Sequence, residues 1–478
     1  MSQSKARFHS LDTDAIVILS SSNWFNELRS NRYHYATRFA RFFPVLFVQA
    51  DLNYKGYQFE VTELDAIKVL HVWKRYDNKQ IDLLNSALLE AGANKPVFWI
   101  YNGQFNCFLA NRDSVLNVYH ATEDYFSSDS YITTPAHQIQ ALNNSLKQCQ
   151  LLVCVSDGVA ESYREKSAFT GTSITVSNGC DYQFYAPASM DLILNSNCSA
   201  SLNLSYPRGL TAGSNDLSEF MDPAVKSREY DDLRAVTLNN DNQTKLIAFY
   251  QGNIFDKLDY ELLIALARQL PNWQFQFCGR VLYNEKGWKQ LTRLPNVQYL
   301  GVLTPEQVRQ RSYQATVGLI PFVESDFLVK RSFPLKAFEY LACGLPVVSI
   351  PIQSLLPYSA VMQFASGVDG FLREILQAQQ LRNNNEHLAL RLEAARAQDY
   401  EDKVKKVLTV IQDLSEQPKL IESKAMPQKN TSERTVCSYF NKTHFIHLIS
   451  RLYDRFPNGL KDRIPPSIKR CLIKKLLT

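Results

Sequence analysis

The chain has 478 residues, which is too long for one hydrophobic core and indicates two or three domains. A hydrophobic content of 45% and an aromatic content of 12% are typical of a packed globular protein and exclude a disordered chain. The nine cysteines form no CxxC pair, no signal peptide opens the chain, and no apolar run reaches the roughly 18 residues of a membrane span. We therefore expect a cytoplasmic protein with reduced thiols and no zinc site.

The net charge of +5 is concentrated at one end of the chain. Residues 425–478 hold 11 Lys and Arg against three acidic residues, so the rest of the chain is slightly acidic. A basic segment with interspersed apolar residues suits contact with an anionic membrane surface, and a helical hairpin packed on the body of the protein is the alternative. Nucleic-acid binding is disfavoured, because the two core domains carry no basic stripe with interleaved aromatic residues.

The first part of the chain alternates strands and helices. Asp14–Ser20 and Pro44–Gln49 are short apolar runs of the kind found in buried strands, and between them Tyr35, Phe39 and Phe42 recur at helical spacing. This pattern predicts a doubly wound parallel sheet with right-handed crossovers over residues 1–188.

A group of titratable residues follows another predicted strand of this domain. His120, Glu123 and Asp124 come directly after the strand Val115–Tyr119, at the carboxyl end where open α/β sheets bind ligands. We expect functional residues here. A structural role for His120 is the competing interpretation, since a lone histidine is more often a satisfied core residue.

The second half of the chain repeats the α/β pattern after an interruption. Residues 189–243 are rich in Ser and Asn and read as an insertion between domains. Residues 244–383 then form a second predicted Rossmann-like domain, in which Gly252, Asn253 and Arg280 lie at strand ends. Residues 384–415 are predicted helices that close the fold, and residues 416–478 a linker with the basic amphipathic tail.

The stretch Gly318–Pro351 carries the strongest local signal. It predicts a strand, a polar loop over residues 324–331, a helix that begins near Ser332 and Pro334, and a further buried strand. Lys336 and Glu339 lie three residues apart on one side of that helix. Spacing alone leaves two interpretations open: a solvated ion pair, or a ligand site in which a lysine meets phosphate and a carboxylate accepts ribose hydroxyls.

The same stretch resembles a known enzyme family. SFPLKAFEYLACGLPVVS is similar to the sugar-nucleotide signature of retaining group 1 (family four) glycosyltransferases, especially the bacterial cell-surface subset that reads PLKxFEYLAxGxPVV. The segments VYHATEDYF and VSNGCDYQFY, which precede it, follow the family order. The resemblance implies the GT-B fold, in which two Rossmann-like domains face a cleft.

The resemblance also implies roles for individual residues. Glu339 would bind the nucleotide ribose, and the segment around the helix start would hold the diphosphate and the donor sugar. The acceptor would lie on the N-terminal domain beside a catalytic residue. The implied donor-binding residues are Gly252, Asn253, Lys257, Arg280, Arg331, Ser332, Phe333, Pro334, Leu335, Lys336 and Glu339, and the catalytic candidates are His120, Glu123 and Asp124.

The sequence departs from the family pattern at two places. The family often has a glutamate eight residues before the ribose glutamate, whereas this chain has Arg331. The usual basic pair after Gly252 is also incomplete, with Asn253 in the first place and Lys257 nearby.

The expected activity is transfer of a sugar, with retention and without a metal or cofactor, from a nucleotide-diphosphate sugar to a glycan or lipid-linked acceptor. Surface polysaccharide or glycolipid synthesis at the inner face of the cell membrane would be the setting. The alternatives are a weakened or non-catalytic sugar-nucleotide-binding or scaffold protein on the same fold, and an α/β dehydrogenase. The dehydrogenase is disfavoured because no GxGxxG follows the first strand of either domain.

Overall fold

The computed structural model describes residues 8, 11–26, 29–64, 66–129, 134–186, 246–282 and 286–416. The predicted insertion at residues 189–243 lies outside these ranges, as does the predicted linker and tail beyond residue 416.

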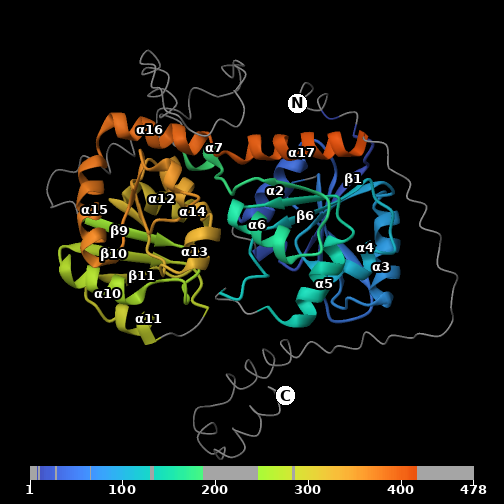
Figure 1. The fold of residues 1–478 in the computed structure, drawn as a ribbon, viewed down its shortest axis with the longest axis horizontal. Coiled ribbons are helices and arrows are strands. Elements are labelled where there is room, and N and C mark those ends of the chain that lie inside the picture. Colours follow the sequence, from blue (N-terminus) through green and yellow to red (C-terminus); the bar gives the residue numbers. More distant parts are fainter. Residues whose placement is uncertain are drawn as a thin grey trace, which may run out of the picture. The chain divides into compact units, whose positions relative to one another are not determined.

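The N-terminal part of the chain forms an eight-stranded sheet (Figure 1). Its strand order is β3-β4-β2-β1-β5-β6-β7-β8, and every neighbouring pair is parallel except β3 and β4. The strands are β1 (Ala15–Ser20), β2 (Val45–Leu52), β3 (Tyr57–Val61), β4 (Ile67–Trp73), β5 (Pro96–Ile100), β6 (Leu116–Ala121), β7 (Leu151–Cys154) and β8 (Thr172–Thr175).

Both faces of this sheet are covered by helices. In β1, Val17 and Leu19 pack on one face with α3 (Asn78–Glu90), α4 (Asn106–Leu109), α5 (Ala136–Leu146) and α6 (Asp157–Lys166). Ile16 and Ile18 pack on the opposite face with α2 (Asn31–Phe39) and α17 (Tyr400–Glu416). Strands that are buried on two faces read as continuous apolar runs, which is why the sequence predicted them well.

The edge strand β3 was not predicted. Its residues Tyr57–Val61 read YQFEV, in which Tyr57 and Phe59 are half-buried and the other three side chains are exposed. The strand is held by antiparallel pairing with β4. The alternation of apolar and polar residues is a short local strand signal, whereas the choice of β4 as partner is a tertiary contact.

The second sheet has six parallel strands in the order β11-β10-β9-β12-β13-β14. The strands are β9 (Leu246–Gln251), β10 (Trp273–Cys278), β11 (Val297–Tyr299), β12 (Val317–Ile320), β13 (Val347–Ser349) and β14 (Met362–Phe364). The helices of this part are α10 (Tyr260–Gln269), α11 (Lys286–Leu291), α12 (Pro305–Gln314), α13 (Asp326–Arg331), α14 (Leu335–Ala342), α15 (Gly367–Leu381) and α16 (Asn385–Arg396).

The helices after residue 384 connect the two sheets. α16 packs against α14 in the second domain, and α17 packs against α2 in the first. Tyr400, Val404 and Leu408 of α17 belong to the core on the α2 side of the first sheet. The last helix therefore completes the N-terminal domain.

The predicted polar loop at residues 324–331 was wrong in part, because residues 326–331 form α13. Ser325 caps this helix by accepting a hydrogen bond from the Leu328 amide at 3.2 Å. Phe327 and Leu328 then bury its apolar side. Six residues with one buried pair give too short a periodic pattern to be recognised in a sequence.

Candidate functional site

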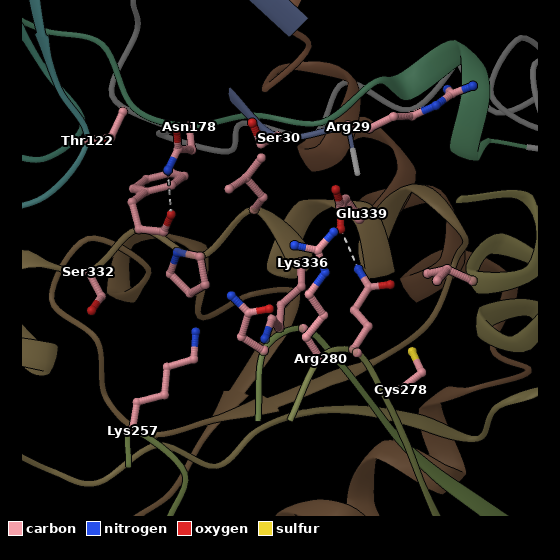
Figure 2. Close-up of a pocket in the computed structure, with 18 of the residues that line it drawn as sticks. Arg29, Ser30, Thr122, Asn178, Lys257, Cys278, Arg280, Ser332, Lys336 and Glu339 are labelled. Atoms are coloured by element: carbon pink, nitrogen blue, oxygen red, sulfur yellow. Dashed lines mark hydrogen bonds between the residues drawn. The ribbon is translucent and has the colours of Figure 1, made fainter. Parts of the chain in front are cut away.

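A cavity of about 900 Å³ opens at the carboxyl ends of strands from both sheets (Figure 2). The loops after β1, β6 and β8 supply its N-terminal wall, which includes Asn26, Glu123 and Asn178. The loops after β9, β10, β11 and β12 supply the C-terminal wall, together with the start of α14. This is the edge at which open parallel sheets bind ligands.

The helix α14 begins at the cavity without a side-chain cap. Its N-cap is Pro334, which has no N–H of its own and offers no side chain to accept a hydrogen bond. Ser332, which the sequence suggested as the cap, is instead the C-cap of α13. The first N–H groups of α14 therefore remain available to an anion in the cavity.

Glu339 lies one turn into α14 and is 9% exposed. The Gln251 side chain donates a hydrogen bond to it (Figure 2). Burial raises the pKa of Glu339 to about 7, and the nearby charge of Lys336 and a hydrogen bond with Tyr185 oppose that shift. A buried carboxylate poised near neutrality is a typical functional group.

Two lysines face the same region of the cavity. The Lys336 Nζ lies 4.0 Å from the Tyr250 ring centroid and 5.2 Å from that of Phe322. It has no hydrogen-bond partner among the described residues. Burial and, secondarily, the charge of Lys257 hold the pKa of Lys336 well below its usual value. Burial likewise lowers the pKa of Lys257 to about 8. A bound anion would relieve both shifts.

Two glycines allow the backbone to approach these groups closely. Gly252 has φ +126°, and a Cβ there would lie 2.8 Å from the Lys336 Nζ. Gly279 has φ +130°, and a Cβ there would overlap the Gly252 carbonyl. Only glycine adopts these conformations readily, so the two loops depend on glycine for both space and dihedral angles.

Arg331 is engaged with the N-terminal domain. Its Nε lies 2.7 Å from the Asp124 Oδ2, and the side chains are 18% and 0% exposed, respectively. The Arg331 carbonyl also accepts a hydrogen bond from the Ser156 hydroxyl at 3.0 Å. The residue that departs from the family pattern thus forms a contact between the two domains.

Twelve of the predicted site residues line the cavity. They are Glu123 and all the donor-binding candidates: Gly252, Asn253, Lys257, Arg280, Arg331, Ser332, Phe333, Pro334, Leu335, Lys336 and Glu339. Their presence together supports the predicted site, while their individual roles stay predictions.

The structure does not bring His120 and Asp124 to the cavity lining, which corrects their predicted place beside the acceptor. Asp124 is buried against Arg331. His120 is 1% exposed and packs among aromatic rings, with its Nδ1 3.1 Å from the Tyr101 hydroxyl. Burial lowers the pKa of His120 to about 3, so the ring is neutral near pH 7.

Several lining residues were missed as site residues. Arg29, Asn178, Tyr185 and Gln251 all line the cavity. In the sequence, Asn178 lies in the segment VSNGCDYQFY and Gln251 directly precedes Gly252 at a predicted strand end, but neither was assigned a role of its own. The one sequence signal for Gln251 is a polar residue that closes an apolar strand just before a glycine. The backbone of Arg29 has φ +47°, a conformation that no sequence pattern announces.

Within the ranges that the structure covers, no group of three or more His, Cys, Asp or Glu residues is placed to hold a metal ion. None of the helices in those ranges is both long and apolar enough to cross a membrane.

Two doubly wound domains with a cavity at the carboxyl ends of both sheets define the GT-B class of fold, as predicted. Solved structures with this fold include sucrose-phosphate synthase from Thermosynechococcus elongatus. It aligns with a TM-score of 0.59 and 12% identity over 84% of this chain and 99% of that chain. Anabaena HepE, solved in complex with UDP, aligns with a TM-score of 0.54 and 13% identity over 84% and 99%.

Sequence comparisons give more particular relatives. Residues 255–389 match the family model described as glycosyl transferases group 1. A Bacillus subtilis protein, TuaH, provisionally described as a teichuronic acid biosynthesis glycosyltransferase, is 32% identical over 125 residues. The matched segment spans 26% of this chain and 31% of that relative.

Proposed function

We propose that this protein is a glycosyltransferase that moves a sugar from a nucleoside diphosphate sugar to an acceptor hydroxyl. The observation that carries the proposal is the arrangement on α14. The unpaired, buried Lys336 lies at the helix start, and the buried carboxylate of Glu339 follows three residues later. Three residues of helix rise about 4.5 Å, a separation that suits the diphosphate and the ribose of one nucleotide.

The donor would bind with its diphosphate near Lys336 and Lys257. Two lysine charges match the two charges of a sugar-linked diphosphate, and the uncapped N-terminus of α14 adds N–H donors. The Glu339 carboxylate would accept hydrogen bonds from the two ribose hydroxyls. The UDP complex of the structurally similar HepE supports a nucleotide in this class of fold.

The reaction would exchange one bond at the anomeric carbon for another. The bond to the diphosphate oxygen breaks and a bond to the acceptor oxygen forms on the same face, while the acceptor hydroxyl loses its proton. Preorganised positive groups stabilise the charge that develops on the diphosphate. Glu123 is the catalytic candidate on the cavity wall, and it would orient the acceptor or take the proton.

The proposal extends to the biological setting. It takes no cofactor besides the donor, and it places the acceptor among glycans or lipid-linked sugars of surface polysaccharide or glycolipid synthesis. The teichuronic acid relative supports that class of acceptor. A cytoplasmic location at the inner face of the membrane, with contact through the basic tail, stays a prediction, because the tail lies outside the described residues.

A non-catalytic nucleotide-sugar-binding protein on the same fold is the second candidate. It is favoured by Arg331, whose side chain is engaged with Asp124 where the resemblance would place a sugar-binding glutamate.

A thermal-shift panel of UDP, GDP, dTDP and CMP sugars tests binding, since a ligand at 100 times its Kd stabilises the folded state by about 2.7 kcal/mol. Release of free sugar or transfer to an added acceptor supports the enzyme. Binding without turnover supports the second candidate, and no shift with any donor contradicts both.

A further inference from the structure

The side-chain amide of Asn178 connects the N-terminal domain to the segment that begins α14. Its Nδ2 donates to the Phe333 carbonyl at 2.9 Å (Figure 2). Its Oδ1 accepts from the Asn31 Nδ2 at 2.6 Å. Asn178 is 7% exposed and lines the cavity, so both ends of its amide are used at the wall of the candidate site.

The hydrogen bonds continue into the N-terminal domain. The Asn31 Oδ1 accepts from the Tyr101 hydroxyl at 2.7 Å, and the Tyr101 oxygen lies 3.1 Å from the His120 Nδ1. Because the Tyr101 hydrogen is given to Asn31, the His120 Nδ1 is the donor in the last contact. The donors therefore run in one direction, from His120 to Phe333, and each amide orientation is determined by its neighbours.

This series of hydrogen bonds ends at the peptide bond that directly precedes helix α14. The Phe333 carbonyl belongs to the peptide bond that precedes Pro334, the N-cap of α14. Pro334 gives that helix start no side-chain hydrogen bond, so its orientation depends on the contacts of the preceding peptide. Fixing the Phe333 carbonyl thus fixes the direction in which the first N–H groups of α14 face the cavity.

The same segment is held from the N-terminal domain at a second point. Ser156 donates to the Arg331 carbonyl, two residues before Phe333. A Cβ on Gly158 would overlap the Lys330 carbonyl, which shows how closely α6 approaches the end of α13. The N-terminal domain thus binds the carbonyls of Arg331 and Phe333 in addition to the Arg331 side chain, which pairs with Asp124.

We propose that Asn178, held in place by Asn31 and Tyr101, is a positioning residue that sets the start of α14 for the donor diphosphate. The proposal rests on the proposed function for the identity of the ligand. A domain expected to bind the acceptor thereby also determines the geometry of the donor site. Asn178 is a positioning residue because the groups that contact the diphosphate in this proposal belong to α14 and not to Asn178 itself.

The test compares three variants in the full chain, with UDP as the probe and with GDP and dTDP if UDP does not bind. Asn178→Asp keeps an oxygen for Asn31 but replaces the donor to Phe333 with a second acceptor. We expect the Kd for the nucleotide to rise about tenfold. Tyr101→Phe removes the donor to Asn31 and should raise the Kd about threefold. In the double variant, the fold increase in Kd should be smaller than the product of the two single increases, because both substitutions disrupt the same series of hydrogen bonds.

Ser177→Ala is the matched control. Ser177 precedes Asn178 but bonds to Gln398 and Lys403, on the α17 side. It should lower the Tm while leaving the Kd within about twofold of wild type. A Kd in Asn178→Asp that stays at the wild-type value, with only the Tm lowered, would show a purely structural contact and overturn the proposal.

A second measurement separates this proposal from the proposed function. If the wild-type protein binds none of the three nucleotides, the proposed function fails. Amide hydrogen exchange of residues 335–341 then decides the positioning role without a ligand. Faster exchange there in Asn178→Asp than in Ser177→Ala supports it, and equal exchange in the two variants overturns it.

Discussion

Charged side chains on the two walls of the cavity differ in whether an ion-pair partner compensates their charge. On the C-terminal wall, Lys257 and Lys336 form no ion pair among the described residues, and burial lowers the pKa of both. On the N-terminal wall, the Arg29 Nη1 lies 3.5 Å from the Asp181 Oδ2, and its Nη2 lies 3.4 Å from the Glu306 Oε1. The Arg29 Cζ lies 3.6 Å from the centroid of the Phe184 ring. The two buried lysines thus stay unpaired, whereas two carboxylates compensate the charge of Arg29 on the opposite wall.

This difference suits the two walls to different roles. Unpaired buried cations cost folding free energy, and a protein keeps them where an anion repays the cost. Paired and hydrogen-bonded groups add stability and fix geometry, as Asn178 does for the Phe333 carbonyl. The C-terminal wall is therefore suited to bind the donor, and the N-terminal wall to hold the binding loop in place.

The largest expected effect comes from removing the unpaired charge at the start of α14. Lys336→Met keeps the approximate volume but loses a charge-assisted contact worth about 1.5–3 kcal/mol. UDP should bind about 10- to 150-fold more weakly by isothermal titration calorimetry. The ligand-free protein should become more stable, because a buried, unpaired ammonium is replaced by an apolar group.

Lys330→Met is the matched control on the neighbouring helix. Lys330 is an exposed residue paired with Asp326, and it does not line the cavity. It should change neither the affinity nor the stability beyond experimental error. Normal UDP binding by Lys336→Met would show that the unpaired charge of Lys336 does not contribute to nucleotide binding.

The pH dependence of donor binding tests Glu339. With a pKa of about 7, the carboxyl is mostly protonated below neutrality and then accepts ribose hydroxyls poorly. Nucleotide affinity should therefore fall as the pH drops from 7 to 5.5. It should also fall above about pH 8, where Lys257 loses its proton. Calorimetry across this range checks both limbs.

Between neutral and acidic pH, the free energy of unfolding of the ligand-free protein should change in the opposite direction to the nucleotide affinity: the Glu339 contribution to it rises as the pH falls. The folded pKa of Glu339 is raised above the unfolded value, so its contribution is fully present at low pH and is lost as the pH rises through about 7.

Glu339→Gln should remove the acidic limb of binding, weaken binding roughly tenfold at pH 7.5, and leave the alkaline limb. An acidic limb that persists in this variant belongs to another group.

The sequence predicted the C-terminal wall far better than the N-terminal one, and the reason is physical. Gly252, Lys336 and Glu339 lie at a strand end and within one helix turn, and the resemblance of this local stretch to the family signature named them, whereas spacing alone left Lys336 and Glu339 undecided. The two sheets were predictable from the residues themselves, since strands buried on both faces leave apolar runs.

The remaining features depend on contacts between residues far apart in the chain. The bond between Asn178 and Phe333 joins positions 155 residues apart, and that between Arg331 and Asp124 joins two domains. Nothing in the neighbourhood of either residue announces its partner. The short helix α13 was missed for a different reason, because six residues with one buried pair, Phe327 and Leu328, are too few for a periodic pattern. The strand β3 was missed although its sequence YQFEV alternates apolar and polar residues.

The ion pair between the domains should affect stability more than binding. In Asp124→Asn, Arg331 loses the partner 2.7 Å away while its side chain stays mostly buried. Breaking a fully buried pair costs about 3–5 kcal/mol. Because Arg331 keeps some solvent contact, we expect about 2 kcal/mol in chemical denaturation and less than a fivefold change in Kd for UDP.

Asp326→Asn breaks a pair on the same helix, but one that is exposed to solvent. No measurable loss of stability is expected there, because exposed pairs contribute little. A large loss of affinity in Asp124→Asn with unchanged stability would show that Arg331 contacts the donor directly, as we expect of Lys257 and Lys336.

The smallest effect is expected at His120. The ring lies outside the cavity lining, is 1% exposed, and is neutral at working pH because burial lowers its pKa to about 3. General base catalysis typically contributes 10²- to 10⁴-fold in rate. His120→Gln keeps a donor for Tyr101, so turnover should change less than about threefold, whereas Glu123→Gln in the same assay should lose about 100-fold. If His120→Gln lost as much as Glu123→Gln, the histidine would have to reach the acceptor in a different arrangement of the N-terminal wall.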